Sequence, residues 1–175
     1  MKELWDAYDK DGNQLGFDLV RGEPVPEGAY HLVVEVVTVT EDGRVLLTQR
    51  HPQKHFGLKW EITGGSVVKG EEPRTAAARE LLEETGIRLP AEELRYLYPL
   101  TVPKHKSIYH TFMAVLPAPC DVTLQATETV DARWLPYEEF LEFAKTEDYA
   151  GPLAERFPPL QEAMDGFFSA LQLLQ

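Results

Sequence analysis

Glu80, Glu83 and Glu84 stand at helical spacing in a segment, residues 75–85, that is rich in Ala, Leu and Glu. This composition predicts a helix, and residues three and four apart on a helix share one face. Three carboxylates on one face repel one another, so at neutral pH they need a cation or raised pKa values. Carboxylate oxygens suit Mg²⁺ or Mn²⁺ better than zinc. A solvated acidic face, with an ion pair from Arg79 to Glu83, is the alternative.

The predicted helix has recognisable ends. Pro73 suits the first turn, where its missing N–H costs nothing, and Gly86 suits the left-handed position that often follows a helix. Gly65 and Glu71 precede the helix at fixed distances from its charged residues. The whole stretch from Gly65 to Ile87, GSVVKGEEPRTAAARELLEETGI, resembles the Nudix box at every defined position.

This resemblance implies a fold and an activity. The implied fold class is α/β, a Nudix-type α/β/α sandwich with a mixed β-sheet, to which the sequence adds an N-terminal β-hairpin and a C-terminal helix. The implied activity is that of a divalent-metal-dependent hydrolase that cleaves the diphosphate linkage of a nucleoside diphosphate derivative. The implied cofactor is Mg²⁺ or Mn²⁺, which would neutralise the diphosphate and lower the pKa of a bound water.

The resemblance also implies roles for individual residues. The metal ligands would be Glu80, Glu83, Glu84 and the backbone carbonyl of Gly64. Arg79 would orient a glutamate of this group through a charged hydrogen bond. The general base stays open among Glu80, Glu84 and Glu128, and Glu128 could equally be a metal ligand or a surface residue. The residues with structural roles in the motif would be Gly65, Glu71 and Gly86, although Glu71 could instead hold the metal through water.

One departure from the family pattern indicates which branch of the family the sequence resembles most. Thr63 stands before the glycine pair, where many Nudix proteins have proline. This form is similar to the branch that contains type 1 isopentenyl diphosphate isomerases and their hydrolase relatives. Isomerases of this kind use a cysteine before the box, and the segment from Trp5 to Lys59 has none. A catalytically silent ligand sensor is the other alternative, but such proteins often lose box carboxylates that this chain keeps.

The net charge argues against binding to a nucleic-acid polymer, and a small diphosphate substrate could approach the acidic face only with bound cations. The 175-residue chain has a formal net charge of −12, whereas binding to a nucleic-acid backbone needs a basic surface. Cationic side chains interrupt this acidity on either side of the box, and solvated loop charge is the alternative reading of them. The candidate substrate-binding residues are Arg50, Lys54, Lys59 and Lys104.

Patterns of apolar and turn residues predict the elements around the helix. Tyr30 to Thr40 is dense in β-branched residues and should form a central strand. The other expected strands are Leu4 to Tyr8, Gln14 to Phe17, Arg44 to Arg50, Trp60 to Thr63, Leu94 to Thr101, Ser107 to Leu116 and a short one ending at Leu135. Further helices are expected from Pro136 to about Lys145 and from Leu160 to Leu174.

The length predicts a single domain over residues 1–175. Within it we expect a hairpin and linker (1–28), a core (29–146) and a C-terminal helical extension (147–175). No apolar run is long enough to cross a membrane and the N-terminus lacks a signal-peptide pattern, so we expect a cytoplasmic protein. The hairpin and the apolar C-terminal helix could support a homodimer.

Overall fold

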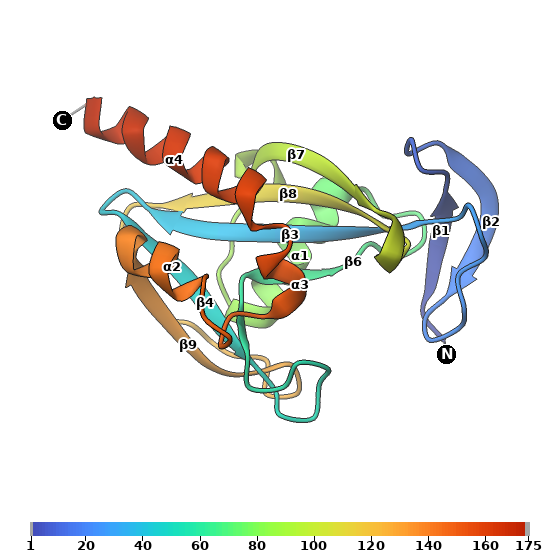
Figure 1. Ribbon diagram of the computed structural model, residues 1–175, viewed down its shortest axis with the longest axis horizontal. Helices are drawn as coiled ribbons and strands as arrows, with labels where there is room; N and C mark the ends of the chain where they lie inside the picture. The colour runs from blue at the N-terminus through green and yellow to red at the C-terminus, as the bar shows by residue number, and fades with distance from the viewer. Residues whose placement is uncertain (1, 174–175) are drawn as a thin grey trace. The chain divides into compact units, whose positions relative to one another are not determined.

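The computed structural model describes residues 2–173 (Figure 1). It is an α/β structure with a mixed sheet, which confirms the predicted fold class. Contacts divide the chain into two compact units, and the single-domain organisation stays a prediction. The first unit contains the chain up to Val36, Gly64–Leu82 and Arg88–Ala114, and the second contains Val37–Thr63, Glu83–Ile87 and the chain from Val115 onward.

The first unit begins with the predicted hairpin of β1 (Leu4–Tyr8) and β2 (Gln14–Val20). The strands are antiparallel, with Trp5 opposite Leu19. Asp9 closes the turn, because its Oδ1 accepts the backbone N–H groups of Asp11 and Asn13, each at 2.9 Å. Trp5, Ala7 and Leu19 form a small buried cluster, so the hairpin has an apolar core of its own.

The hydrogen-bonded strands of the first unit include β6 (Thr63–Ser66), β7 (Arg95–Val102), β8 (Ser107–Leu116) and the start of β3 (His31–Thr40). β7 and β8 run antiparallel, from Arg95 opposite Met113 to Val102 opposite Ser107. Nearly all of β3 is buried, as its continuous apolar sequence predicts. Short 3₁₀ turns cover Ala91–Glu93 and Pro103–His105.

The helix α1 (Pro73–Thr85) has the boundaries that its flanking proline and glycine predict. Ala76, Ala77 and Leu81 are fully buried along its inner side. Near its start, the guanidinium of Arg74 lies 5.4 Å from the centre of the Phe112 ring on β8. The apolar face therefore fixes the rotation of the helix, and this rotation decides where the charged face points.

The second unit contains β4 (Arg44–Arg50), β5 (Trp60–Glu61), β9 (Thr129–Pro136), α2 (Tyr137–Phe143), α3 (Gly151–Ala154) and α4 (Phe157–Leu173). β4 and β9 pair antiparallel over their whole length, as Figure 1 shows, from Arg44 opposite Pro136 to Arg50 opposite Thr129. β5 pairs with the end of β4, where Thr48 faces Glu61. Within residues 2–173, none of the helices is long and apolar enough to cross a membrane.

Some predicted boundaries were wrong. Trp60 to Thr63 is not one strand, because the chain is interrupted at Ile62 between β5 and β6. The last helix starts at Phe157 rather than Leu160, since the two prolines that follow Phe157 are tolerated in a first helical turn. The single-turn helix α3 was not predicted from the sequence. Leu174, the predicted end of the last helix, lies outside the described residues.

Candidate catalytic site

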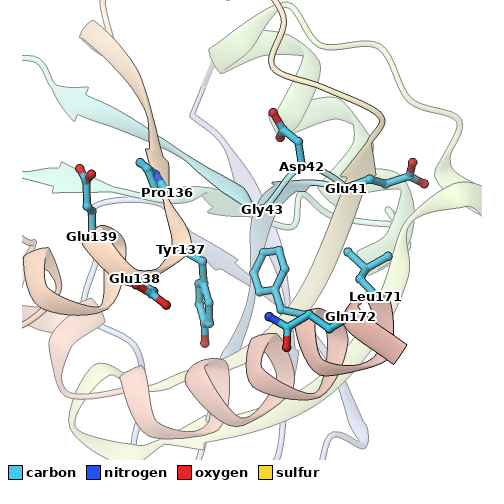
Figure 2. A pocket seen from close by; sticks show the side chains of 10 residues that line it. Glu41, Asp42, Gly43, Pro136, Tyr137, Glu138, Glu139, Leu171 and Gln172 are labelled. Carbon is cyan, nitrogen blue, oxygen red and sulfur yellow. The ribbon is translucent and has the colours of Figure 1, made fainter. Parts of the chain in front are cut away.

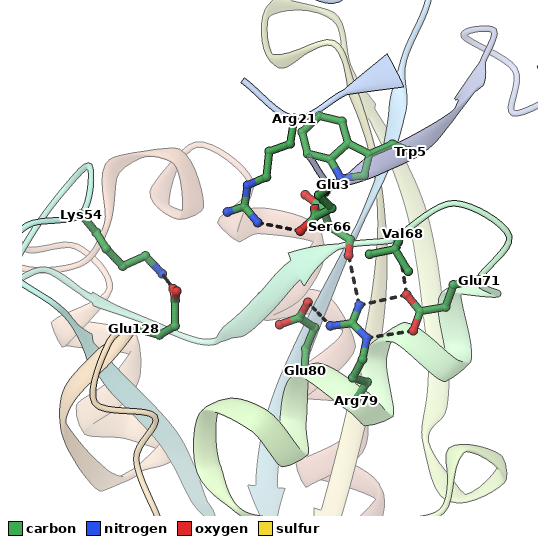
Figure 3. A network of polar contacts seen from close by, with 10 residues as sticks. All are labelled: Glu3, Trp5, Arg21, Lys54, Ser66, Val68, Glu71, Arg79, Glu80 and Glu128. Atoms are coloured by element: carbon green, nitrogen blue, oxygen red, sulfur yellow. Dashed lines mark hydrogen bonds and ion pairs between the residues drawn. The ribbon is translucent and has the colours of Figure 1, made fainter. Parts of the chain in front are cut away.

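Arg79 is the centre of a charged network in the first unit (Figure 3). Its Nε and Nη2 donate to the two carboxylate oxygens of Glu71, both at 2.9 Å. Its Nη1 donates to Oε1 of Glu80 at 2.7 Å, and Nη2 also reaches the carbonyl of Ser66 at 3.2 Å. A guanidinium that holds two carboxylates in this way fixes both side chains, because its donors lie in one rigid plane.

The charges in this network shift one another's protonation. The pKa of Arg79 is raised, first by its hydrogen bonds to Glu71 and then by those to Glu80. Burial raises the pKa of Glu71, but hydrogen bonds from Arg79 and from the backbone N–H of Val68 outweigh burial, so the net shift is downward. Both groups are therefore charged at neutral pH, and the network is a set of ion pairs.

Glu80 lies directly against the backbone of Gly65. A Cβ atom added to Gly65 would be 2.1 Å from Oε1 of Glu80, far inside van der Waals contact. Gly64 is close-packed as well, since a Cβ there would lie 2.9 Å from the carbonyl oxygen of Val34 on β3. The glycine pair that the sequence singles out is thus a place where only backbone fits.

The other two candidate ligands follow on α1. Glu83 is exposed, whereas the side chain of Glu84 is buried. Gly86 follows the last helical residue with a φ of 72°, the left-handed conformation that a helix stop requires. Among residues 2–173, no three His, Cys, Asp or Glu side chains are arranged closely enough to hold a metal ion.

The donor chemistry nevertheless suits a hard divalent cation. Glu80, Glu83 and Glu84 provide carboxylate oxygens on one helix, and Mg²⁺ typically takes only one or two protein carboxylates and completes its shell with water and substrate. In the described arrangement Glu80 instead accepts a hydrogen bond from Arg79. The residues therefore fit such an ion by chemical type, and their ligand roles stay predictions.

The second unit contains a buried ion pair that involves a residue not predicted from the sequence. Nη1 of Arg50, a predicted substrate-binding residue, donates to Oε2 of Glu61 at 2.5 Å. Their side chains are only 18% and 13% exposed. Burial raises the pKa of Glu61, and Arg50 counteracts this effect. The pairing of β4 with β5 brings the two residues together, so the sequence alone gave no local signal for Glu61.

The predicted cations have different surroundings. Nζ of Lys54 forms an ion pair with Oε2 of Glu128, one of the candidate bases. Figure 3 shows the two side chains pointing toward each other. Nζ of Lys59 lies 4.0 Å from Oδ1 of Asp148. Lys104, in the first unit, is exposed on the 3₁₀ turn Pro103–His105.

The second unit also has a cavity of about 400 Å³ (Figure 2). The ring of Tyr137 and the α4 residues Phe168 and Leu171 contribute apolar surface, and acidic side chains of Glu41 and Glu138 also line it. None of the described residues that line this cavity is a predicted site residue. The cavity is therefore not part of the candidate site.

Comparison with known proteins points to one family. The family model described as NUDIX domain matches residues 29–157. An uncharacterized Nudix hydrolase from Listeria monocytogenes is 32% identical over 139 residues, which cover 78% of this chain and 82% of the relative. Nudix hydrolase 3 from Arabidopsis thaliana is 31% identical over 163 residues, which cover 85% of this chain but 21% of that longer protein.

Solved structures show the same fold. The crystal structure of DR0079 from Deinococcus radiodurans matches with a TM-score of 0.72 and 23% sequence identity. The match covers 87% of this chain and 96% of that one. At this identity the likeness supports the arrangement of strands and helices and says nothing of a substrate.

Proposed function

The chain belongs to the Nudix family, and from this premise we propose that it is a divalent-metal-dependent hydrolase that cleaves the diphosphate linkage of a nucleoside diphosphate derivative. Family membership makes it a pyrophosphohydrolase in class. The observation that best supports the proposal is the network in which Arg79 holds Glu80 at 2.7 Å and Glu71 through two hydrogen bonds. It holds Glu80, on the charged face of α1, and Glu71, just before the helix, in fixed positions.

The proposed metal ligands are Glu80, Glu83, Glu84 and the carbonyl of Gly64. A bound Mg²⁺ or Mn²⁺ would neutralise charge on the diphosphate and lower the pKa of a water molecule. The protein positions the ligands: α1 carries all three carboxylates, and the bare backbone of Gly65 leaves room for the Glu80 side chain. Because the helix is rigid, little reorganisation is needed when charge develops on the phosphate.

Arg79 has a positioning role in this proposal. Its guanidinium directs one oxygen of Glu80 and is itself directed by Glu71. Glu71 also accepts a hydrogen bond from the backbone N–H of Val68 at 3.2 Å, which ties the network to the loop before the helix. This arrangement favours a structural role for Glu71 over ligation of a metal through water.

The proton acceptor for the attacking water stays open among Glu80, Glu84 and Glu128. Each has a different environment: Glu80 accepts from Arg79, Glu84 is buried, and Glu128 pairs with Lys54. A base must be charged and able to reach water when substrate binds. Glutamine variants at each position, compared by the pH dependence of kcat, would separate these three.

The test of the proposed function is a substrate panel with Mg²⁺ and with Mn²⁺. It contains nucleoside di- and triphosphates, ADP-ribose, dinucleotides, nucleotide sugars and isoprenoid diphosphates, and it measures release of phosphate and nucleotide. Glu83→Gln is the blank, and Glu162→Gln, an exposed helical glutamate on α4, is the matched control. We expect selective turnover that Glu83→Gln removes and Glu162→Gln keeps.

Two outcomes would contradict the proposal. Equal turnover by Glu83→Gln and the unsubstituted protein would remove Glu83 from the ligand set. No turnover of any compound by folded protein would reject hydrolysis of this substrate class. The cytoplasmic location and the homodimer stay predictions, which fractionation and the solution mass would test.

A further inference from the structure

The loop of residues 51–59, between β4 and β5, is folded tightly on itself. Its base is closed by backbone hydrogen bonds from Arg50 to the carbonyl of Lys59 at 2.9 Å and from Leu58 to the carbonyl of Arg50 at 3.1 Å. Phe56 and Leu58 have positive φ values of 57° and 65°. Such conformations are disfavoured for these residues, so the surrounding structure must hold the loop in shape.

Arg50 is the side chain that holds it. Its Nε donates to the carbonyl of His55 at 2.8 Å, in the middle of the loop, while its Nη1 donates to Glu61. Gln49 adds a hydrogen bond from its Nε2 to the carbonyl of Leu58 at 3.0 Å. The guanidinium is therefore committed to the loop and to Glu61, which is a different use from the substrate contact predicted for it.

Lys54 is held in another way. Its ion pair with Glu128 is partly exposed, with 26% of the lysine and 36% of the glutamate side chain accessible. The main chain of Glu128 is fixed independently, because its carbonyl accepts from His51 at 2.9 Å and its N–H donates to Gln125 at 2.8 Å. The ion pair can consequently open without disturbing the backbone on either side.

We propose that Arg50 and Glu61 are positioning residues for this loop, and that Lys54 exchanges its bond to Glu128 for a bond to a phosphate group of the substrate. This inference rests on the proposed function, because it assumes a diphosphate substrate. An ammonium group suits the exchange because it is a compact charge with three rotatable N–H donors. It can therefore bind a carboxylate or a phosphate without requiring one particular geometry of the partner. A phosphate group competes well with one carboxylate for such a cation because it carries more charge.

The exchange has a consequence for Glu128. While Lys54 is bound to it, the carboxylate is neutralised by a neighbour. When a phosphate takes Lys54, Glu128 becomes an uncompensated anion beside the bound substrate. Substrate binding and the release of a candidate base are thus coupled through one lysine side chain.

The test measures binding of inorganic pyrophosphate by calorimetry, in EDTA and without divalent metal, up to millimolar concentrations. Lys54→Met should weaken binding at least about fivefold, since a charged hydrogen bond is lost. Glu128→Gln should strengthen binding about threefold, the size of a partly exposed ion pair. The double variant Lys54→Met/Glu128→Gln should bind like Lys54→Met, because the gain requires the lysine.

The matched control is an ion pair between Glu142 on α2 and Lys145 just after this helix. Nζ of Lys145 lies 2.6 Å from Oε1 of Glu142, and both side chains are largely exposed. Lys145→Met changes the net charge as Lys54→Met does, and Glu142→Gln changes it as Glu128→Gln does. Neither control should alter the affinity for pyrophosphate. A gain in Glu142→Gln equal to that in Glu128→Gln would overturn the exchange, since it would reflect net charge alone. No gain in Glu128→Gln, or no pyrophosphate binding, would overturn it too.

The positioning role has a separate readout. Arg50→Lys keeps the charge but loses the planar guanidinium with its several donors. It should weaken pyrophosphate binding when Lys54 is present, and it should cause no further weakening when it is combined with Lys54→Met. Limited chymotrypsin digestion at Phe56 and Leu58 should be faster in Arg50→Lys, whereas Arg44→Lys on the same strand is the control. If the losses of affinity in Arg50→Lys and Lys54→Met were additive and the rate of chymotrypsin digestion were unchanged, the positioning role of Arg50 would be overturned. Because these measurements need no turnover, they stand or fall separately from the substrate panel.

Discussion

The carboxylate of Glu80 occupies the space that any side chain on Gly65 would need. The distance from Oε1 to an added Cβ is 2.1 Å, and the other carboxylate oxygen would lie 2.5 Å away. The glycine is required by this contact rather than by backbone conformation, since Gly65 is not among the glycines with positive φ. The motif therefore keeps a residue without a side chain so that a carboxylate can pack on its backbone.

Gly65→Ala should impair turnover more than stability. The new methyl group must displace Glu80, and displacement of a positioned catalytic group by about 1 Å costs on the order of a hundredfold in rate. The control is Gly166→Ala on α4, where an added Cβ meets nothing within 4 Å. That change should leave turnover alone and raise the free energy of unfolding by roughly 0.5–1 kcal/mol. Turnover by Gly65→Ala at the level of Gly166→Ala would contradict the close packing.

Arg79→Lys should lower both activity and stability, because lysine cannot make the two parallel hydrogen bonds to Glu71. Loss of a charged, partly buried hydrogen bond typically costs about 1–3 kcal/mol. The measurements are urea denaturation and kcat. The control, Arg88→Lys, changes an exposed arginine beyond the helix. Equal stability of the two variants would show that the bidentate geometry has no energetic role.

Arg50→Met should make stability strongly dependent on pH. Burial raises the pKa of Glu61, and removing Arg50 removes the largest effect that lowers it. A carboxyl group with a raised folded-state pKa stabilises the fold at low pH, and this stability is lost as pH rises through the folded pKa. Removing one partner of a buried ion pair costs about 3–5 kcal/mol, and partial exposure reduces this value.

Urea denaturation at pH 5 and pH 8 measures the Arg50→Met prediction. The variant should lose more stability than the unsubstituted protein between these two values. The double variant Arg50→Met/Glu61→Gln lacks the carboxylate of Glu61 and should not show the additional loss. The same loss in both variants would exclude Glu61 as its cause.

His31 should contribute a second pH dependence, at the hairpin. It stacks on Trp5 with ring centroids 4.2 Å apart, and burial, with a smaller contribution from Arg21, lowers its pKa to about 4. The ordinary pKa of a histidine side chain, which we take for the unfolded chain, is 6.5. The unfolded chain therefore takes up a proton first, and stability is lost as pH falls from about 6.5 to 4. Urea denaturation at pH 7, 5.5 and 4.5 measures this effect: the free energy of unfolding of His31→Phe should fall less over this range than that of the unsubstituted protein. An equal fall in both proteins would refute the prediction.

Metal removal should abolish turnover, and readdition of Mg²⁺ should restore it. A readout without turnover is the melting temperature, which should rise with Mg²⁺ because a ligand that binds only the folded state stabilises it. Glu83→Gln should need more Mg²⁺ for the same rise, whereas Glu162→Gln should respond like the unsubstituted protein. A melting temperature that ignores Mg²⁺ in every protein would argue against a resident cation.

Local signals predicted the fold and the charged helix well. Pro73 and Gly86 mark both ends of α1, and the apolar run Tyr30 to Thr40 corresponds to the buried strand β3. These features follow from the conformational preferences of neighbouring residues. The family resemblance, which rests on the same short stretch, is confirmed by the match over residues 29–157.

Features that depend on distant pairing could not be predicted in this way. Glu61 is an ordinary strand glutamate in the sequence, and only the pairing of β5 with β4 makes it the partner of Arg50. The sequence likewise marks Lys54 and Glu128 as separate candidates, and it cannot show that they bind each other. Charge and residue type identified the participants, while tertiary structure determined their partners.

The ion pairs described for the two units differ greatly in the length of chain that separates their members. Arg79 and Glu71 are 8 residues apart, whereas Lys54 and Glu128 are 74 apart. A short loop closes quickly and at low entropic cost, while a contact between distant residues must wait for the intervening chain to fold. We therefore expect the ion pair of Arg79 with Glu71 to form early in refolding and the ion pair of Lys54 with Glu128 to form late.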